Sequence, residues 1–444
     1  MKTPIYDFLK EYAEGDSVRF HMPGHKGKGP LGVEKYDITE FCGADNLFSP
    51  DGIILESENY ASELFGTAHS FFSTEGSTLA IKTMLSIVTS GKSGAKILAG
   101  RGAHKSFLYA MALLGVEPTW LYPENSTHLC SSAVSGLDVE SALKENSDVC
   151  AVYVTSPDYL GNISDIEGIA KVCKKRGIPL LVDNAHGAYL NFLNPSRHPI
   201  ALGASMCCDS AHKTLPVLTG GAYLHISKNA PSEYLDSARR MASVFASTSP
   251  SYLILGSLDL CNAYLADGYS VKLSDTVKKI DKVKQMLSDF GYTVLGSEPL
   301  KIVIDANDYG YSGVEIASHL SKNKIEIEFF DGEYLVLMLT PENSDSDYER
   351  LAAVLTALPK KEPIQKNAAD LKINAPKVMS VREAVFSKQE SVSVNNALGR
   401  ICASPAVSCP PAVPIVVSGE VITEEAILLF ERYGIKTIEV VKND

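Results

Sequence analysis

The sequence lacks any apolar run as long as the roughly 18 residues that a membrane-spanning helix requires. Its first residues, MKTPI, also lack the apolar stretch of a secretory signal peptide. Basic residues are fewer than acidic ones, 41 against 53, so the net charge is −12. Nucleic acids bind chiefly to basic faces, so this balance argues against a nucleic-acid partner. We expect a cytoplasmic protein that meets neither a membrane nor a nucleic acid.

Metal-ligand spacing is also missing. The nine cysteines contain no Cys-x-x-Cys pair, and an odd, scattered set predicts reduced thiols that lie mostly in the core. His21 and His25 are four residues apart, but Pro23 and Gly24 between them exclude a shared helix face. No metal site is therefore predicted. With Lys26, the two histidines could instead meet an anionic group.

What the sequence does contain is a regular alternation of short apolar strands with helices. Strands are expected at 69–73, 96–99, 119–122, 149–154, 180–183, 204–208 and 220–226, the last one antiparallel. This order predicts an α/β fold with a mostly parallel, seven-stranded sheet and helices on both faces. Smaller α+β domains should follow on the C-terminal side, with a long helix over 274–290, strands over 325–329 and 334–339, and a turn at Asp331-Gly332.

Polar residues gather where these strands end. Ligands of such sheets bind beyond the carboxyl ends of the strands. The residues expected there are Ser77, Thr78, His104, Ser156, Asp183, His186, Ser210, His212 and Lys213.

The acid and the lysine in this set suit one cofactor. Pyridoxal phosphate needs an amine for a Schiff base and an acid for its pyridinium nitrogen. Lys213 and Asp183 supply both, each just after an apolar strand. Ser77 and Thr78 stand between a strand and a helix, where backbone N–H groups and hydroxyls form a phosphate cradle, although the same residue types also cap ordinary helices.

Nine motifs occur in a fixed order along nearly the whole chain. They are His21-Met22-Pro23-Gly24-His25-Lys26-Gly27, Asp37-x-Thr39-Glu40-x-x-Gly43-x-Asp45-x-Leu47, Phe72-x-x-x-Gly76-Ser77-Thr78, His104-Lys105-Ser106, Thr155-Ser156-Pro157, Val182-Asp183-x-Ala185-His186-Gly187, Ser210-x-His212-Lys213-Thr214-Leu215-Pro216, Thr248-Ser249-Pro250-Ser251-Tyr252, and Pro410-Pro411 through Gly419-Glu420. In this set the chain resembles the Orn/Lys/Arg decarboxylase family, pyridoxal-phosphate enzymes of the aspartate-aminotransferase fold (fold type I). It is similar to the short form, without an N-terminal wing domain.

The resemblance implies a role for each site residue. Lys213 carries the cofactor, Asp183 pairs with the ring nitrogen, and His186 lies near the ring hydroxyl and the substrate carboxylate. His104 stacks on one face of the ring and Ala185 packs on the other. The phosphate is bound by Ser77, Thr78, Ser210 and His212, Ser156 also belongs to the cofactor site, and Thr248 reaches the cofactor of a partner subunit. Lys213, His186, Asp183 and His104 are the implied catalytic residues, with no metal.

The resemblance also implies the domains and the activity. Residues 1–65 form an N-terminal segment and dimer arm, 66–270 the cofactor-binding large domain, 271–358 a small α/β domain and 377–444 a C-terminal decarboxylase domain. The activity is that of a carboxy-lyase. It converts arginine, lysine or ornithine into an amine and carbon dioxide, as in polyamine biosynthesis, and it works as a homodimer with a shared active site.

Two alternatives stay open. One is another pyridoxal-phosphate enzyme, such as an aminotransferase or another lyase. Aminotransferases commonly hold the substrate carboxylate with a small-domain arginine, and no arginine lies between Arg240 and Arg350. The other is an inactive regulatory homologue, against which the intact Asp183 and Lys213 argue. The chain departs from the family pattern at Glu75, Asp158, Leu160, Asn184, Gly220 and Cys409.

Overall fold

A computed structural model describes residues 1–122, 128–365, 375–404 and 413–443. The chain divides into two compact units, each of which gathers separate stretches of sequence. The first comprises 1–92, 150–153 and 166–272, and the second comprises 93–149, 154–165 and 273–444. Cys409 and Pro410-Pro411, which the sequence analysis singled out, lie outside the described residues.

The largest sheet has seven strands in the order β1-β7-β6-β5-β4-β2-β3. They are β1 (His69–Ser73), β2 (Lys96–Gly100), β3 (Glu117–Leu121), β4 (Ala151–Thr155), β5 (Leu180–Asp183), β6 (Met206–Asp209) and β7 (Ala222–Ile226). β2 is parallel to β3 and β5 to β6, whereas β7 runs antiparallel to both β1 and β6. The predicted fold class and the antiparallel last strand are confirmed.

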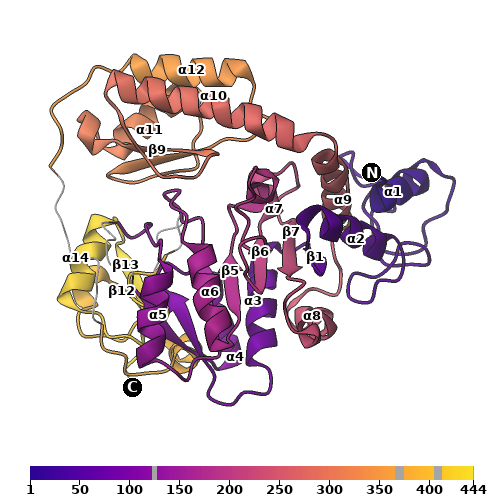
Figure 1. Cartoon of the computed structure of the whole chain (residues 1–444), viewed down its shortest axis with the longest axis horizontal. Helices are drawn as coiled ribbons and strands as arrows, with labels where there is room; N and C mark the ends of the chain where they lie inside the picture. Colours follow the sequence, from indigo (N-terminus) through magenta and orange to yellow (C-terminus); the bar gives the residue numbers. More distant parts are fainter. Residues whose placement is uncertain (123–127, 366–374, 405–412, 444) are drawn as a thin grey trace. The chain divides into compact units, whose positions relative to one another are not determined.

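The helices of the first unit surround its part of this sheet (Figure 1). They are α1 (Pro4–Glu14), α2 (Ile53–Phe65), α3 (Gly76–Thr89), α6 (Ile166–Arg176), α7 (Ala211–Thr214), α8 (Ser232–Phe245) and α9 (Tyr252–Ala266), with a 3-10 turn, η1 (Ala188–Phe192). α3 is mostly buried and packs against β1, β6, β7 and α8. Its apolar run of residues therefore serves as the central core helix of this unit.

The second unit holds helices α4 (Lys105–Leu114) and α5 (Gly136–Glu145) and a four-stranded antiparallel sheet. The order of that sheet is β10-β11-β9-β8, from β8 (Thr293–Leu295), β9 (Lys301–Asp305), β10 (Phe329–Phe330) and β11 (Tyr334–Met338). The helical elements near it are α11 (Gly313–Lys322), α12 (Asp345–Thr356) and η2 (Asn307–Tyr309). α10 (Tyr269–Phe290) begins in the first unit and continues in the second.

The last part of the second unit forms its own small core. It contains α13 (Val381–Phe386), β12 (Gln389–Ser393), η3 (Val394–Asn396), α14 (Glu424–Arg432) and β13 (Thr437–Val441). β12 pairs antiparallel with β13. Apolar side chains such as Ile422, Leu429, Phe430 and Ile438 are almost fully buried between these elements. This burial is the main source of the stability of such a small sheet.

Two expectations for the second half need correction. The strand predicted over 325–329 is wrong except at its end, because only Phe329–Phe330 pairs with β11. The long helix begins at Tyr269, five residues before the predicted start at 274. The turn at Asp331-Gly332 between two antiparallel strands is confirmed, and Asp331 Oδ1 accepts hydrogen bonds from the N–H groups of Glu333 and Tyr334.

The described cysteines agree with the prediction made from the composition. All eight described cysteines are free, and six of them are buried, which confirms the prediction of reduced core residues for this set. Among the described residues, no helix is long and apolar enough to cross a membrane.

Candidate active site

Lys213 lies on the short helix α7, directly after β6. Its Nζ is 3.0 Å from Nε2 of His186, which lies in the turn after β5. Burial of the His186 side chain is nearly complete, at 6% exposure. The two residues come from the ends of neighbouring parallel strands, so the pairing of β5 with β6 brings an amine and an imidazole together. At this distance the two nitrogens can exchange a proton.

Asp183 ends β5 and is surrounded by donors from its own unit. Its Oδ2 accepts the hydroxyl of Tyr153 at 3.2 Å. Its Oδ1 accepts the N–H of Ala185 at 3.2 Å and the S–H of Cys208 at 3.6 Å. Burial raises the pKa of Tyr153 and of Cys208 well above their ordinary values, so both keep the protons that they donate. These contacts fix the orientation of the Asp183 carboxyl group.

Two hydroxyls meet at the N-terminus of α3. Ser210 Oγ donates to Ser77 Oγ at 2.8 Å, and the N-cap residue, Glu75, makes no side-chain capping bond to the helix. Gly76 opens the helix with a φ of +67°, and its N–H donates to the carbonyl of Gly220 at 2.7 Å. Gly220 itself has a φ of +99°, a conformation that side chains disfavour. The arrangement offers hydroxyls and helix N–H groups to an anion, as a phosphate cradle requires.

His212 stands beside this cradle on α7. Its Nδ1–H donates to the carbonyl of Gly221 at 2.9 Å, which fixes the ring. Burial lowers the pKa of His212, and the positive charge of Lys213 acts in the same direction. Without a bound anion, we therefore expect a neutral ring near pH 7.

The loop that carries Thr248 is attached to the start of α3. The N–H of Ser247 donates to Glu75 Oε1 at 2.7 Å. Glu75 directly precedes Gly76, so this hydrogen bond connects the loop to the start of α3. Glu75, at which the chain departs from the family pattern, thus makes a hydrogen bond within its own unit.

His104 and Ser156 belong to the second unit. His104 is the N-cap of α4, and its Nδ1 accepts the N–H of Ser106 at 3.1 Å. Ser156 Oγ accepts the N–H of Ser164 at 3.1 Å. Asp158, another departure from the family pattern, is buried and accepts the N–H of Ser132 at 2.9 Å. The expected roles of His104 and Ser156 beside the cofactor stay predictions.

The residues of the first unit fit pyridoxal phosphate in their chemistry. They supply an amine, a carboxylate held by three donors, and hydroxyls at a helix N-terminus. The structure brings together Lys213 with His186, and Ser77 with Ser210. Sequence reasoning missed Tyr153 and Cys208, the donors to Asp183. No local pattern marks them, because both reach Asp183 only through the order of strands in the sheet.

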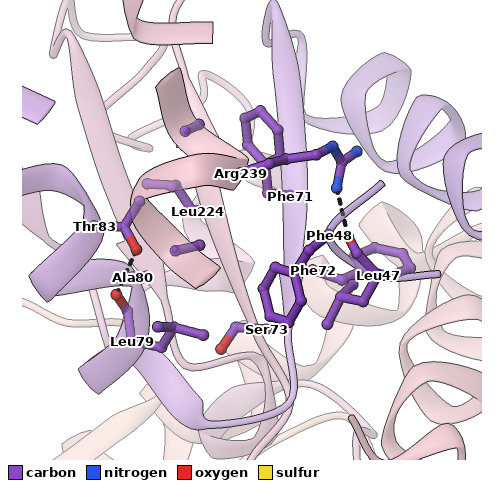
Figure 2. Close-up of a pocket in the computed structure, with 12 residues that line it drawn as sticks. Leu47, Phe48, Phe71, Phe72, Ser73, Leu79, Ala80, Thr83, Leu224 and Arg239 are labelled. Atoms are coloured by element: carbon purple, nitrogen blue, oxygen red, sulfur yellow. Dashed lines mark hydrogen bonds between the residues drawn. The ribbon is translucent and has the colours of Figure 1, made fainter. Parts of the chain in front are cut away.

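A separate cavity near β1 does not serve as this site (Figure 2). It is mostly apolar, lies among β1, α3 and α8, and measures about 20 Å³, which is room for a single water molecule. Arg239 at its edge donates to the carbonyl of Leu47 at 2.9 Å and also pairs with Glu58. The guanidinium is thus engaged within the protein, and the cavity is too small for a cofactor or an amino acid.

Comparison with known proteins gives two family matches. The family described as Orn/Lys/Arg decarboxylase, major domain, matches residues 3–302, and the Orn/Lys/Arg decarboxylase, C-terminal domain, matches 365–433. Among curated relatives, an arginine decarboxylase of Bacillus subtilis is 30% identical over 96% of this chain and 92% of its own. The inducible lysine decarboxylase of Escherichia coli is 21% identical, over 95% and 75%.

Solved structures show the same fold. The structure of lysine decarboxylase A from Pseudomonas aeruginosa superposes with a TM-score of 0.80 at 17% identity, covering 99% of this chain and 80% of that one.

Proposed function

The chain belongs to the Orn/Lys/Arg decarboxylase family, and from this premise we propose that it decarboxylates a basic amino acid, with arginine as the first substrate to test. The observation that carries the proposal is the contact of 3.0 Å between Lys213 Nζ and His186 Nε2, next to the strand end that bears Asp183. The 30% identity to an arginine decarboxylase over almost the whole chain supports arginine over the other two amino acids.

Pyridoxal phosphate is the cofactor of this family, and when bound it withdraws electrons from the bond to the departing carboxylate. Asp183 is proposed to hold the ring nitrogen. Tyr153 and Cys208 orient its carboxyl group, and burial keeps both of them protonated. Asp183 is only 2% exposed, so water competes little for that contact.

Lys213 and His186 are proposed to handle protons. The amine of Lys213 would hold the cofactor. His186 Nε2, 3.0 Å away, can receive a proton from the lysine nitrogen or return one to it. The near-complete burial of His186 limits the access of water to this pair.

The remaining cofactor contacts are also part of the proposal. Ser77, Thr78, Ser210 and His212 would bind the phosphate, His104 and Ala185 would contact the ring, and Ser156 would also belong to the site. Thr248 is proposed to serve the partner subunit of a homodimer. The free state of all eight described cysteines supports a reducing compartment, the cytoplasm, where the amine product could enter polyamine synthesis.

A panel of amino acids tests the proposal. The purified protein is incubated with added cofactor and with arginine, lysine, ornithine or alanine, and amine and carbon dioxide are measured. We expect both products from one basic amino acid and none from alanine. A keto acid formed without carbon dioxide would instead identify an aminotransferase. No product and no visible absorbance band from bound cofactor would indicate an inactive homologue.

A further inference from the structure

The carboxylate of Asp209 is fully buried, and this residue directly precedes Ser210 of the proposed site. Its Oδ2 accepts Nε2–H of His198 at 3.0 Å and of His225 at 3.2 Å. Its Oδ1 accepts the amide of Asn184 at 2.7 Å. All four side chains are 0% exposed. A carboxylate accepts hydrogen bonds, so the three nitrogens are the donors and both oxygens of Asp209 are satisfied.

Asn184 and Asp209 each adjoin a residue of the cofactor site. Asp183 precedes Asn184 at the end of β5, and Ser210 follows Asp209 at the end of β6. The last pair in the β5–β6 register is Asp183 with Cys208, after which the N–H of Asn184 donates to the Cys208 carbonyl at 3.0 Å. The side-chain bond from Asn184 to Asp209 thus joins the two strands beyond their regular ladder.

Side chains on two further strands, β7 and β1, support the hydrogen bond between Asn184 and Asp209. His225 on β7 faces Cys207 in register, and its Nδ1 is 2.7 Å from Ser70 Oγ on β1. Burial lowers the pKa of His225, so the ring is neutral, with its proton on Nε2 towards Asp209 and with Nδ1 accepting from Ser70. Thr67 in turn lies 2.8 Å from Ser70. These hydrogen bonds therefore hold the carboxylate of Asp209 in one orientation.

A metal ion is the competing explanation for part of this cluster. Donor atoms of His198, Cys207 and Asp209 lie within 4.8 Å of one another. The hydrogen bonds explain the geometry without a cation, because Asp209 already has three donors. Burial also raises the pKa of Cys207, which disfavours the thiolate that a metal would need.

We propose that Asp209 is a positioning residue for the cofactor, acting through its hydrogen bond with Asn184 to fix Asp183 and Ser210 relative to each other. The proposal rests on the roles given above to Asp183 and Ser210. It also gives the departure at Asn184 a function, since this side chain is turned into the core and towards Asp209.

Three variants separate the effect of the hydrogen bond between Asn184 and Asp209 from the effect of the negative charge of Asp209. Asn184→Ala removes the link but keeps Asp209 with both histidines. Asp209→Ala removes the whole acceptor. Asp209→Asn removes the charge, yet its carbonyl still accepts from the histidines. If the Asn184 amide turns over, the new amide can donate to Asn184 Oδ1, which has no hydrogen-bond partner among the described residues. Leu180→Ala, a buried change at the far end of β5, is the control for general destabilisation.

The readouts are the dissociation constant for pyridoxal phosphate and the pH at which the visible band of bound cofactor changes. We expect Asn184→Ala and Asp209→Ala to weaken binding by about tenfold or more and to shift that pH. Asp209→Asn should stay within about threefold of wild type at an unchanged pH. Leu180→Ala should lower the melting temperature but leave both readouts as in wild type.

Three results would overturn the proposal. The first is wild-type binding and pH dependence in Asn184→Ala, which decides the matter even if Asp209→Ala does not fold. The second is a loss in Asp209→Asn equal to that in Asp209→Ala, which would assign the effect to charge. The third is one equivalent of zinc in the wild-type holoprotein that Asp209→Ala lacks. Failure of the wild-type protein to bind cofactor would instead refute the proposed function.

Discussion

At the scale of single residues, the proposed chemistry depends on side chains that face one another across neighbouring strand ends. Lys213 approaches His186 to 3.0 Å, and Asp183 is oriented by Tyr153 and Cys208. The proton-handling role proposed for His186 makes it the most informative single residue to change.

We predict that His186→Gln lowers kcat by about 10² to 10⁴, the usual range for loss of a general acid–base. Cofactor binding should be nearly unchanged, because Lys213 and Asp183 remain. Steady-state kinetics and the visible spectrum of the holoenzyme measure both effects. A variant with normal kcat would show that His186 moves no proton in the rate-limiting step.

A second residue-scale prediction concerns pH. Burial lowers the pKa of His225 below its ordinary value of 6.5, although Asp209 opposes this. The unfolded chain therefore takes up a proton at a higher pH than the folded one does. Stability is fully present above pH 6.5 and falls as the pH drops towards the folded-state pKa, by up to about 1.4 kcal/mol per pH unit for this group.

Urea unfolding between about pH 8 and about pH 5 measures this slope. His225→Gln should unfold more easily at every pH but with a shallower dependence on pH. Identical slopes in the two proteins would mean that His225 titrates alike in both states.

Sequence alone could identify Lys213 and Asp183, because each polar residue follows an apolar strand and the edge of a parallel sheet collects such positions. It could not identify Tyr153, Cys208 or Asp209 as their supports. These contacts depend on which strands are neighbours in the sheet, β6 beside β5 and β5 beside β4, and on which side chains of those strands face one another, which no local pattern in the sequence reveals. Cysteines in apolar runs also look like ordinary core residues.

At the scale of elements, the start of α3 organises the proposed phosphate site. The turn at Gly76, the carbonyl of Gly220 and the two hydroxyls of Ser77 and Ser210 converge there. The helix N-terminus contributes N–H groups and the positive end of its dipole. Helix α3 was expected from the sequence. Its contact with Ser210 was not, because that contact requires β6 to end beside the start of α3.

We predict that Ser210→Ala weakens cofactor binding by about 10- to 100-fold, since a hydrogen bond to a charged group contributes about 1.5–3 kcal/mol. Fluorescence titration of the apoprotein with pyridoxal phosphate measures the change. Ser90→Ala, at the exposed C-terminal end of the same helix, is the matched control and should bind normally. Equal affinity of the two variants would place the phosphate elsewhere.

Elements with weak local signals were the ones missed. α8 was not expected, because its one buried residue is Ala238 and its surface is largely polar. It forms by packing against α3, a contact that no local pattern reveals. The strand expected over 325–329 failed for the opposite reason. Its apolar residues alternate with Glu326 and Glu328, but a strand also needs a neighbour, and only Phe329–Phe330 pairs with β11.

At the scale of the whole molecule, the N-terminal segment exposes several large apolar side chains. Val18, Phe20 and Leu31 are 74%, 93% and 81% exposed. Apolar side chains gathered in one segment are typical of an interface. This observation supports the proposed homodimer, in which Thr248 serves the neighbouring site.

We predict that the protein sediments at twice its chain mass of 47.9 kDa. The double variant Phe20→Ser, Leu31→Ser should shift the equilibrium towards the monomer and reduce activity in parallel, because each site then loses its partner. Leu137→Ser, a change of another highly exposed apolar residue, on α5, is the control and should remain dimeric. A fully active monomer would contradict the shared active site.

The most direct test of the central account is the stoichiometry of the reaction with carboxyl-labelled arginine, or with the basic amino acid that the panel selects. Labelled carbon dioxide and amine are counted for the wild-type holoenzyme and for Lys213→Ala. We predict one carbon dioxide per amine in the wild type, and neither product nor a visible cofactor band in the variant. Full turnover by Lys213→Ala, or label retained in a keto acid product, would contradict the account.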